Sequence, residues 1–245
     1  MRNRDNRQRE NRMVVEGNKG VIELLSSSTE AVRIYVTNSF EVEKIRKLAL
    51  VKDVEIIEVN SKDMAIMSSL RTAPGVLAIG KIPIFRIEEV VRLDKTKKNH
   101  VPTLLILDDL SDPGNVGTLI RTADWFGLAG VICSPRTADI WNPKVIQSSM
   151  GSVFKIPVCI CDPLDVIRTF NLTTVALDSR GDNLYKSSLI PDAFIVGSES
   201  HGLNKDLLEA CSSTWAIPGT GSAESLNAAI AGAVVSSELS RRCAN

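Results

Sequence analysis

The chain has 245 residues and a mass of 26.7 kDa, with 44% hydrophobic residues, 24% charged residues and a formal net charge of zero. This composition is typical of a globular protein with one large or two small domains, and it excludes wholesale disorder. No apolar run approaches the roughly 20 residues of a membrane-spanning helix, and residues 1–12 lack the apolar segment of a secretory signal. Five cysteines without a C-x-x-C spacing argue against a disulfide framework or a zinc ribbon, so we expect a reducing, cytoplasmic location. With only two histidines, we expect no metal site.

The charge is divided unevenly along the chain. Residues 1–101 carry 19 Lys and Arg against 14 Asp and Glu, whereas residues 102–245 carry 10 against 15. Such a split indicates two domains with different partners, and the positive half could face a polyanion.

The N-terminal residues 1–12 contain five arginines and almost no apolar residue, which predicts a disordered basic arm. Two interpretations stay open for this arm, namely contacts with RNA phosphates or an inert solvated tail. The arginines are Arg2, Arg4, Arg7, Arg9 and Arg12.

A smaller α/β domain is predicted over residues 13–92. Apolar runs rich in Val and Ile alternate with helical patterns, which predicts a parallel or mixed sheet covered by helices. The expected helices cover 16–26, 41–50 and 62–70, and the expected strands cover 33–37, 54–59 and 75–80. A polar, lysine-rich segment at residues 93–101 predicts the linker.

Residues 102–245 predict a doubly wound α/β domain. The expected strands cover 103–110, 130–134, 155–160, 173–178, 193–198 and 214–217, and the expected helices cover 115–126, 143–150, 163–170, 204–210 and 225–241. In such sheets ligands bind at the loops that leave the carboxyl ends of strands. The residues after Asp108, Asp178, Gly197 and Ile217 are therefore candidates for function.

Several common enzyme motifs are missing. The segment GVLAIGKI (75–82) has the G-x-x-x-x-G-K spacing, but Ile82 stands where a magnesium-binding Ser or Thr is needed. No G-x-S-x-G is present, and no G-x-G-x-x-G follows a strand. ATP, serine-hydrolase and nicotinamide chemistry are disfavoured.

Three segments do carry informative patterns. In the first, residues 108–121, a Pro-Gly turn follows a strand and Asn115 opens a helix on which Thr118 and Arg121 follow at three-residue intervals. Free N–H groups at a helix start attract anions, and an arginine there can donate two parallel hydrogen bonds to a phosphate. The alternative is a helix cap with a solvated arginine.

The second and third segments follow strands near the C-terminus. IVGSESHGL (195–203) places a tight glycine loop after a strand, and IPGTGSAESLNAAIAGAV (217–234) leads through a glycine loop into a helix of small residues. Glycine lets a ligand or another backbone approach closely. An ordinary turn and a tightly packed core helix are the alternatives.

Taken in order, DPGNVGTLIRTADWFG (112–127) and these two segments resemble the three signature motifs of the SpoU (TrmH-like) branch of the SPOUT RNA methyltransferases. The resemblance covers residues 102–245. Residues 13–92 resemble the accessory substrate-binding domain of some of these enzymes, which is similar to kink-turn-binding ribosomal proteins.

The resemblance implies transfer of a methyl group from S-adenosylmethionine to a ribose 2′-hydroxyl of ribosomal or transfer RNA. It also implies a catalytic α/β domain with a deep trefoil knot, which general topology rules would not predict. The family forms homodimers, with the cofactor in the knot loops beside the partner subunit. The ribosomal-protein-like first domain favours large-subunit ribosomal RNA over transfer RNA. A non-catalytic RNA-binding or assembly protein of the same fold is the alternative.

Family roles carry over to eight residues. The matched catalytic positions are Asn115, Arg121, Glu199, Ser225 and Asn227, and the matched cofactor-binding positions are Gly197, Ile217 and Leu226. One departure is the second motif, which often reads G-x-E-G-x-G, because Ser200 and His201 fill its middle here. We assign no role to His201.

A guanidinium is a poor base because its pKa exceeds about 12. We therefore expect Arg121 to stabilise the developing 2′-alkoxide, while the other matched residues orient the ribose and shape the loops. A contact between Arg121 and an adjacent phosphate stays open as a second role.

Overall fold

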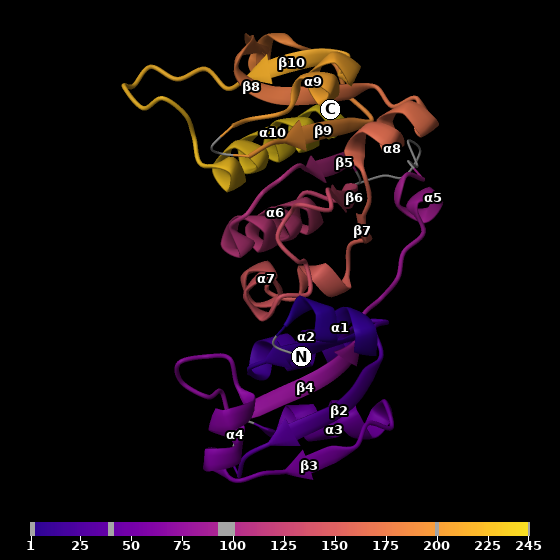
Figure 1. Ribbon diagram of the computed structural model, residues 1–245, viewed down its shortest axis with the longest axis vertical. Helices are drawn as coiled ribbons and strands as arrows, with labels where there is room; N and C mark the ends of the chain where they lie inside the picture. Colours follow the sequence, from indigo (N-terminus) through magenta and orange to yellow (C-terminus); the bar gives the residue numbers. More distant parts are fainter. Residues whose placement is uncertain (1–2, 39–41, 93–100, 199–200, 245) are drawn as a thin grey trace. The chain divides into compact units, whose positions relative to one another are not determined.

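The computed structural model describes residues 3–38, 42–92, 101–198 and 201–244, and it forms two compact α/β units (Figure 1). Unit 1 comprises Met1–Ile84 together with Asp139–Lys155, and unit 2 comprises Phe85–Ala138 together with Ile156–Asn245. The predicted fold class, a larger parallel α/β domain preceded by a smaller α/β domain, is confirmed.

Unit 1 is built on a four-stranded mixed sheet in the order β1-β4-β2-β3. Strands β1 and β2 are both antiparallel to β4, and β2 is parallel to β3. One face of this sheet packs on α2. A Cβ atom added at Gly80 of β4 would lie 3.4 Å from Leu24 of α2 and 3.0 Å from Met13 of the neighbouring strand β1. The elements are β1 (Arg12–Glu16), α2 (Asn18–Ser26), β2 (Ala31–Val36), α3 (Glu43–Val51), β3 (Ile56–Glu58), α4 (Ser61–Met67) and β4 (Val76–Lys81).

The N-terminal segment differs from the prediction. Residues Arg4–Glu10 form helix α1, whose cap Asn3 accepts a hydrogen bond from the Asp5 N–H at 2.9 Å. The Arg7 side chain is only 3% exposed, and its Nε donates to Asp139 at 3.0 Å. The disordered arm is therefore wrong for the described residues 3–12. Asp139, which lies 132 residues further along the chain, holds this segment in place, and no local pattern in the sequence indicates that contact.

Residues 139–155 also belong to unit 1, although they lie inside the sequence of the second predicted domain. Helix α7 (Pro143–Ser149) packs against β1, and Lys155 pairs with Glu23 at 2.7 Å. Gly151 lies at φ +92°, and a Cβ atom there would lie 2.5 Å from the Cβ of Glu23. Conversely, α5 (Ile87–Val90), which we placed at the end of the first domain, packs into the core of unit 2 through Val90.

Unit 2 contains a six-stranded parallel sheet in the order β10-β8-β9-β5-β6-β7. The central strand β5 ends in a continuous apolar run, residues 104–107, that is buried on both faces, as is typical of parallel sheets. Helix α10 packs on α6, whereas α5, α8 and α9 cover the core cluster around Ile106. The strands are β5 (Val101–Leu107), β6 (Leu128–Cys133), β7 (Val158–Ile160), β8 (Thr174–Asn183), β9 (Ala193–Val196) and β10 (Ser213–Ala216). The helices are α6 (Pro113–Trp125), α8 (Pro163–Phe170), α9 (Lys205–Ala210) and α10 (Ala228–Cys243), with 3₁₀ turns at Ser152–Phe154 and Leu184–Lys186.

The chain reaches the sheet edge in β10 and then returns in α10 to pack beside α6 and β5 (Figure 1). The strand order alone does not test the trefoil knot, which stays a prediction. Among the described residues, no helix is long and apolar enough to span a membrane.

A charged network fixes the end of α10. The Arg242 guanidinium donates to the carbonyl oxygens of Leu184 and Leu189 at 2.6 and 2.7 Å and to Glu238 at 2.9 Å, and it lies 5.1 Å from the Trp215 ring centre. The hydrogen bonds from Arg241 and Arg242 lower the pKa of Glu238 to about 2, against the opposing effect of its burial. The network therefore ties the last helix to the β8–β9 connection.

This network predicts acid sensitivity. Because the pKa of Glu238 in the fold, about 2, lies below its ordinary value of 4.5, its stabilising contribution is complete above about pH 4.5 and is lost as the pH falls toward 2. Glu238→Gln should lower the melting temperature at pH 7 and flatten its dependence on pH below 4.5, measured by circular dichroism. Glu209→Gln, in an exposed pair with Lys205, is the control and should behave as the parent protein.

Candidate active site

The first predicted segment forms the start of α6. Asp112 is the N-cap, and its carboxylate accepts a hydrogen bond from the Asn115 N–H at 2.9 Å. Pro113 occupies the first helical turn, where its missing N–H costs nothing. These local signals place Asn115 in the first turn, directly beyond the carboxyl end of β5.

The third segment forms the start of α10. Asn227 is the N-cap, and its side-chain oxygen accepts hydrogen bonds from the N–H groups of Ala229 and Ile230 at 2.9 and 3.3 Å. Its side-chain nitrogen donates to Oδ1 of Asn115 at 3.2 Å. Two predicted site residues, 112 positions apart in the chain, are thus brought into direct contact at the N-termini of two neighbouring helices.

The small residues of α10 explain this contact. A Cβ atom at Gly232 would lie 2.3 Å from Leu119 of α6 and 3.5 Å from Val196 of β9. A larger residue there would have to displace the Leu119 side chain, so Gly232 allows the two helices to pack closely. The close-packing interpretation of the last helix therefore holds, and it is also what holds Asn227 against Asn115.

The second segment forms a tight loop after β9. Gly202 has φ +65°, and its N–H donates to the carbonyl oxygen of Ser198 at 2.9 Å. A Cβ atom at Gly197 would lie 2.7 Å from the Leu203 side chain and 3.1 Å from the backbone of Gly202, so a larger residue would force both to shift. Glu199 lies outside the described residues, as does Ser200, and His201 is exposed.

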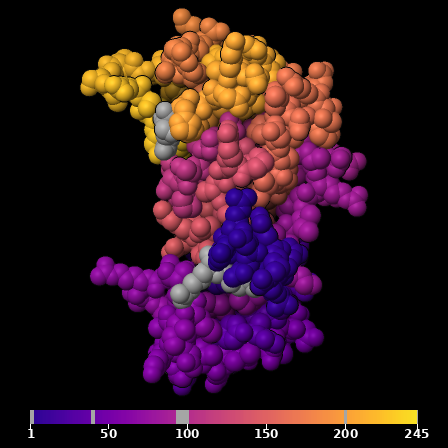
Figure 2. All heavy atoms as spheres, in the orientation of Figure 1, coloured from indigo at the N-terminus to yellow at the C-terminus, as the bar shows by residue number. Residues whose placement is uncertain are grey.

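The loop between β10 and α10 offers its backbone to a ligand. Residues 218–226 are described and exposed, and none of their backbone groups forms a backbone hydrogen bond with another described residue. Ser225 and Leu226 lie in this loop, and Ile217 is half-buried at its start. Figures 1 and 2 show the loop standing away from the rest of unit 2.

Arg121 does not join the asparagine pair. It is exposed on α6, roughly 9 Å along the helix axis from Asn115, because six residues rise about 1.5 Å each. Among the described residues it forms no ion pair or hydrogen bond. The three-residue intervals from Asn115 through Thr118 to Arg121 do not keep these residues on one side of the helix, since six positions leave Arg121 rotated by about a third of a turn from Asn115.

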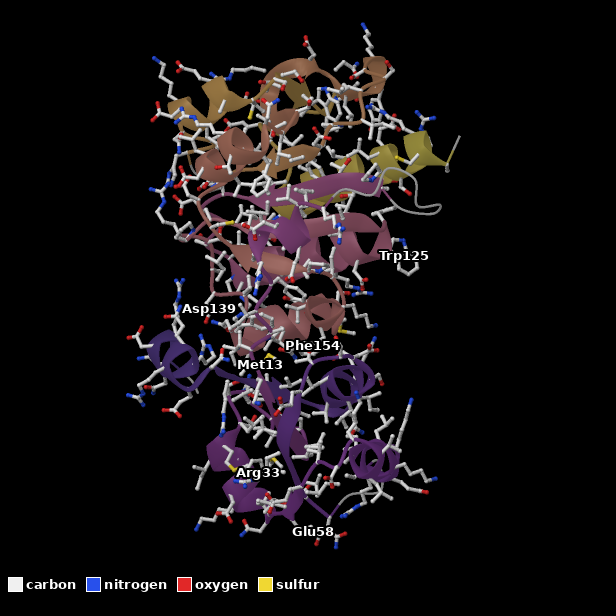
Figure 3. The ribbon with its side chains drawn as sticks, turned by 90° about the vertical axis from the view of Figure 1, so that its right-hand side faces the viewer. Met13, Arg33, Glu58, Trp125, Asp139 and Phe154 are labelled. Atoms are coloured by element: carbon white, nitrogen blue, oxygen red, sulfur yellow. The ribbon has the colours of Figure 1, made fainter. Side chains whose placement is uncertain are left out.

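Large apolar side chains lie exposed on the same two helices. Trp125 is 81% exposed and Ile230 is 53% exposed, and Figure 3 shows the Trp125 side chain pointing outward from α6. Trp125 follows Arg121 by one helical turn, so both lie on one exposed face. We did not single out these two residues from the sequence. The signal was present as an aromatic residue on the polar side of α6.

A buried carboxyl group supports the turn into the first segment. Asp108 is 4% exposed, and its burial raises its pKa, although a hydrogen bond with Ser134 opposes this. The next residue, Asp109, lies at φ 55°, donates its N–H to Ser134 Oγ at 3.0 Å and pairs with Arg136 at 3.4 Å. This cluster fixes the strained turn that leads to Asn115.

Two other features carry no part of the site. Within the described part of the chain, no group of three or more His, Cys, Asp or Glu side chains could hold a metal ion. A hollow of about 490 Å³ between α8 and α9, lined in part by Arg168 and Glu209, contains none of the predicted site residues.

Comparison with known families now decides the assignment. Residues 102–237 match the SpoU rRNA Methylase family, and residues 1–78 match the MRM3-like substrate binding domain. The chain belongs to the SpoU rRNA methylase family. The SpoU match covers all three predicted motifs and ends before the last turns of α10. The other match covers most of unit 1.

Related proteins are similar over different lengths. The 23S rRNA (guanosine(2553)-2′-O)-methyltransferase RlmP of Bacillus subtilis is 36% identical over 162 residues, which cover 61% of this chain and 62% of RlmP. The chain thus spans less than two thirds of that relative. The structure of a TrmH-family protein of Porphyromonas gingivalis is 31% identical with a TM-score of 0.82, and covers 98% of this chain and 94% of that one. An rRNA methyltransferase of Sinorhizobium meliloti, solved with S-adenosylmethionine bound, is 26% identical with a TM-score of 0.83, covering 98% and 90%.

These comparisons identify S-adenosylmethionine as the cofactor of the SpoU fold. The geometry of this chain suits it. A loop whose backbone donors and acceptors are unpaired among the described residues, residues 218–226, starts beside β10 and ends at the asparagine pair. At Gly219 and Gly221 a Cβ atom would meet nothing within 4 Å, so the space beside the loop is open at these two positions.

Proposed function

We propose that this protein is an S-adenosylmethionine-dependent RNA 2′-O-ribose methyltransferase that acts on large-subunit ribosomal RNA. The contact between Asn115 and Asn227, next to the free backbone of residues 218–226, is the observation that carries the proposal. The activity of the Bacillus subtilis relative, a 23S rRNA 2′-O-methyltransferase, supports the ribose as the methylated group and ribosomal RNA as the substrate. Transfer RNA is the alternative substrate.

In this site the cofactor would supply the methyl group from its sulfonium sulfur, which leaves as the neutral thioether of S-adenosylhomocysteine. The chain's own residues position the reactants. Backbone groups of Gly197, Ile217 and Leu226 hold the adenosine, while Asn115, Asn227, Glu199 and Ser225 orient the ribose. Arg121 stabilises the negative charge that develops on the 2′-oxygen as it loses its proton.

The position of Arg121 supports a site shared between two subunits. Arg121 forms no hydrogen bond with the asparagine pair among the described residues, and it lies on an exposed helix face with Trp125. Isologous pairing of this face with a second copy covers Trp125 and Ile230 and carries Arg121 to the partner's cofactor loop. The proposed enzyme is a homodimer.

The test of the function is methyl transfer from labelled S-adenosylmethionine to purified RNA. Ribosomal RNA extracted from cells lacking this protein should accept label, and the product should resist alkali at one position because a 2′-O-methyl group blocks cleavage. Label in transfer RNA alone would move the substrate to the alternative. No label in either RNA, with the cofactor bound, would favour a non-catalytic RNA-binding protein.

Cofactor binding is a separate expected result. Calorimetry should show binding of S-adenosylhomocysteine and none of ATP, because the loops that match the motifs offer backbone groups to adenosine and the only G-x-x-x-x-G-K segment is strand β4. Gly197→Ala should weaken S-adenosylhomocysteine binding, since its Cβ would displace Leu203. Binding of ATP but not of S-adenosylhomocysteine would contradict the assignment of these loops.

The homodimer predicts a mass of twice 26.7 kDa by light scattering at micromolar concentration. Trp125→Glu should shift the mass toward the monomer, because it places a charge in the covered apolar face. Ile66→Glu, at an apolar residue of unit 1 that is 66% exposed, is the matched control and should leave the mass unchanged. A monomer mass for the parent protein would contradict the shared site.

A further inference from the structure

The end of strand β7 carries two cysteine thiols that contact each other. Cys159 lies within the strand and Cys161 follows its last residue, and side chains two positions apart along a strand point to the same face. Their Sγ atoms lie 3.5 Å apart. The Cys161 N–H donates to the carbonyl oxygen of Cys133 at 3.1 Å, so Cys161 continues the pairing of β7 with β6. The sheet therefore holds both thiols in place.

The backbone positions of the two cysteines allow a bond between their sulfur atoms. An extended strand rises about 3.3 Å per residue, which puts Cα atoms two positions apart about 6.6 Å from each other. Disulfides span Cα separations of about 4.4–6.8 Å, so this pair lies near the upper limit. A bond formed there needs side-chain movement and little change of the backbone. It would be strained, and strained disulfides are readily reduced.

The two thiols differ in reactivity. Cys161 is half-buried, so solvent reaches it, whereas Cys159 is only 9% exposed. The hydrogen bond from the Cys159 thiol lowers the pKa of Cys161, against the opposing effects of burial and of Asp162. The same hydrogen bond, together with burial, raises the pKa of Cys159. Because the thiolate is the nucleophile, Cys161 is the thiol that attacks first, and Cys159 is placed to react with it afterwards.

A third thiol near this pair, that of Cys133, is kept apart from it by the sheet. Cys133 is paired in register with Ile160, and Ile132 is paired with Cys159. Since side chains alternate between the two faces of a sheet, Cys133 points to the face opposite to Cys159 and Cys161. It is also only 1% exposed, and burial raises its pKa. Cys133 is therefore a core residue.

We propose that Cys159 and Cys161 form a reversible disulfide when the protein meets hydrogen peroxide. In the first step the Cys161 thiolate attacks one peroxide oxygen and the O–O bond breaks. Cys161 becomes a sulfenic acid, and the departing hydroxide takes up the proton that Cys161 released. In the second step the Cys159 sulfur attacks the Cys161 sulfur, the S–O bond breaks, and the hydroxide leaves as water with the Cys159 proton. Each sulfur loses one electron, and the peroxide is reduced to two molecules of water.

Mass spectrometry of tryptic peptides tests the proposal, because trypsin isolates the pair. Cleavage after Lys155 and Arg168 releases peptide 156–168, which contains Cys159 and Cys161 and no other cysteine. The full-length protein is treated with hydrogen peroxide, and the remaining thiols are then alkylated with iodoacetamide in denaturant. The peptide should carry no alkyl group and weigh about two mass units less than its reduced form, because two hydrogens are lost. Dithiothreitol before alkylation should restore two alkyl groups.

Variants test the order of the two steps. Cys159→Ser removes the second thiol, so peroxide should leave a sulfenic acid on Cys161 that dimedone traps. Cys161→Ser removes the attacking thiol, and Cys159 should then react roughly tenfold or more slowly than Cys161 does in the parent protein. Cys243→Ser changes a half-buried cysteine of α10 and is the matched control, which should form the disulfide like the parent protein. Melting temperatures show whether each variant is folded.

Three results would overturn the proposal. One is alkylation of both thiols in peptide 156–168 under peroxide treatment that already oxidises Cys243. Another is a disulfide that joins this peptide to the Cys133 peptide, residues 122–136, or to a second copy of itself. The third is a Cys161→Ser variant whose Cys159 reacts as fast as Cys161 does in the parent protein. None of these cysteines is among the residues assigned to methyl transfer, so a protein that methylates no RNA would leave the test unaffected.

Discussion

Replacing Arg121 with alanine should lower the rate of methyl transfer by roughly 100-fold or more, while the affinity for S-adenosylhomocysteine stays nearly unchanged. Arg121 is exposed and forms no ion pair or hydrogen bond within the described residues, so its loss removes no interaction that the fold needs. Its effect should therefore fall on turnover. Single-turnover kinetics with saturating cofactor and calorimetry on the same preparation measure the two quantities.

Two further experiments test whether the guanidinium of Arg121 is needed and which subunit's site Arg121 serves. Arg121→Lys should also lose activity, because an ammonium group cannot reproduce the planar fork of a guanidinium. If Arg121 serves the partner's site, mixing inactive Arg121→Ala and Asn227→Ala subunits should restore roughly a quarter of the activity, since half of randomly formed dimers then hold one complete site. A full rate in Arg121→Ala would remove this residue from the mechanism, and no recovery on mixing would place it in its own subunit's site.

Breaking the buried pair between Arg7 and Asp139 should destabilise unit 1 by about 3–5 kcal/mol, because one charge is left buried without its partner. The two side chains are only 3% and 10% exposed. Asp139 also accepts a hydrogen bond from the Trp141 N–H at 3.1 Å, which puts a buried fluorophore beside the pair. Urea unfolding of Arg7→Ala, followed by tryptophan fluorescence, should shift to lower denaturant.

A neighbouring arginine provides the control. Arg9 is 73% exposed and, within the described part of the chain, pairs with the adjacent Glu10 alone, so Arg9→Ala should change the free energy of unfolding by no more than about 0.5 kcal/mol. If Arg7→Ala were as harmless as Arg9→Ala, the pair would contribute nothing. Because Arg7 is structural, deleting residues 1–12 would confound RNA binding with folding, and substitutions of exposed arginines such as Arg9 are the cleaner test of phosphate contacts.

The sequence predicted unit 2 well because most of its strands are recognisable as local apolar patterns. Strands β5, β6 and β9 are short, fully apolar runs, and the helices after them begin at recognisable caps such as Asp112 and Asn227. Strand β8 was predicted too short. Its second half is polar and continues to Asn183, where it pairs with Ala216 of β10 after a register shift, and such edge pairing leaves no hydrophobic signal.

The parts that escaped prediction depend on distant partners. Strand β1 was missed because its apolar residues merge with the start of the next helix. Helix α1 was missed because Arg7 is buried against Asp139, which lies far along the chain. In the site, the family resemblance selected Asn115 and Asn227 but could not show that they touch. That contact needs α6 and α10 to pack closely at Gly232, which is a property of the fold and of no single segment.

The interleaving of residues 139–155 with unit 1 limits how this protein can be divided. A fragment that starts at the linker would keep α7 but lose strand β1, against which it packs, together with Glu23 and Arg7, the ion partners of Lys155 and Asp139. It would expose the apolar face of α7 and leave Asp139 and Lys155 without these ion partners. A fragment that ends at the linker would lose the same contacts from the other side. A domain-swapping experiment would therefore have to carry residues 139–155 along with the first 84.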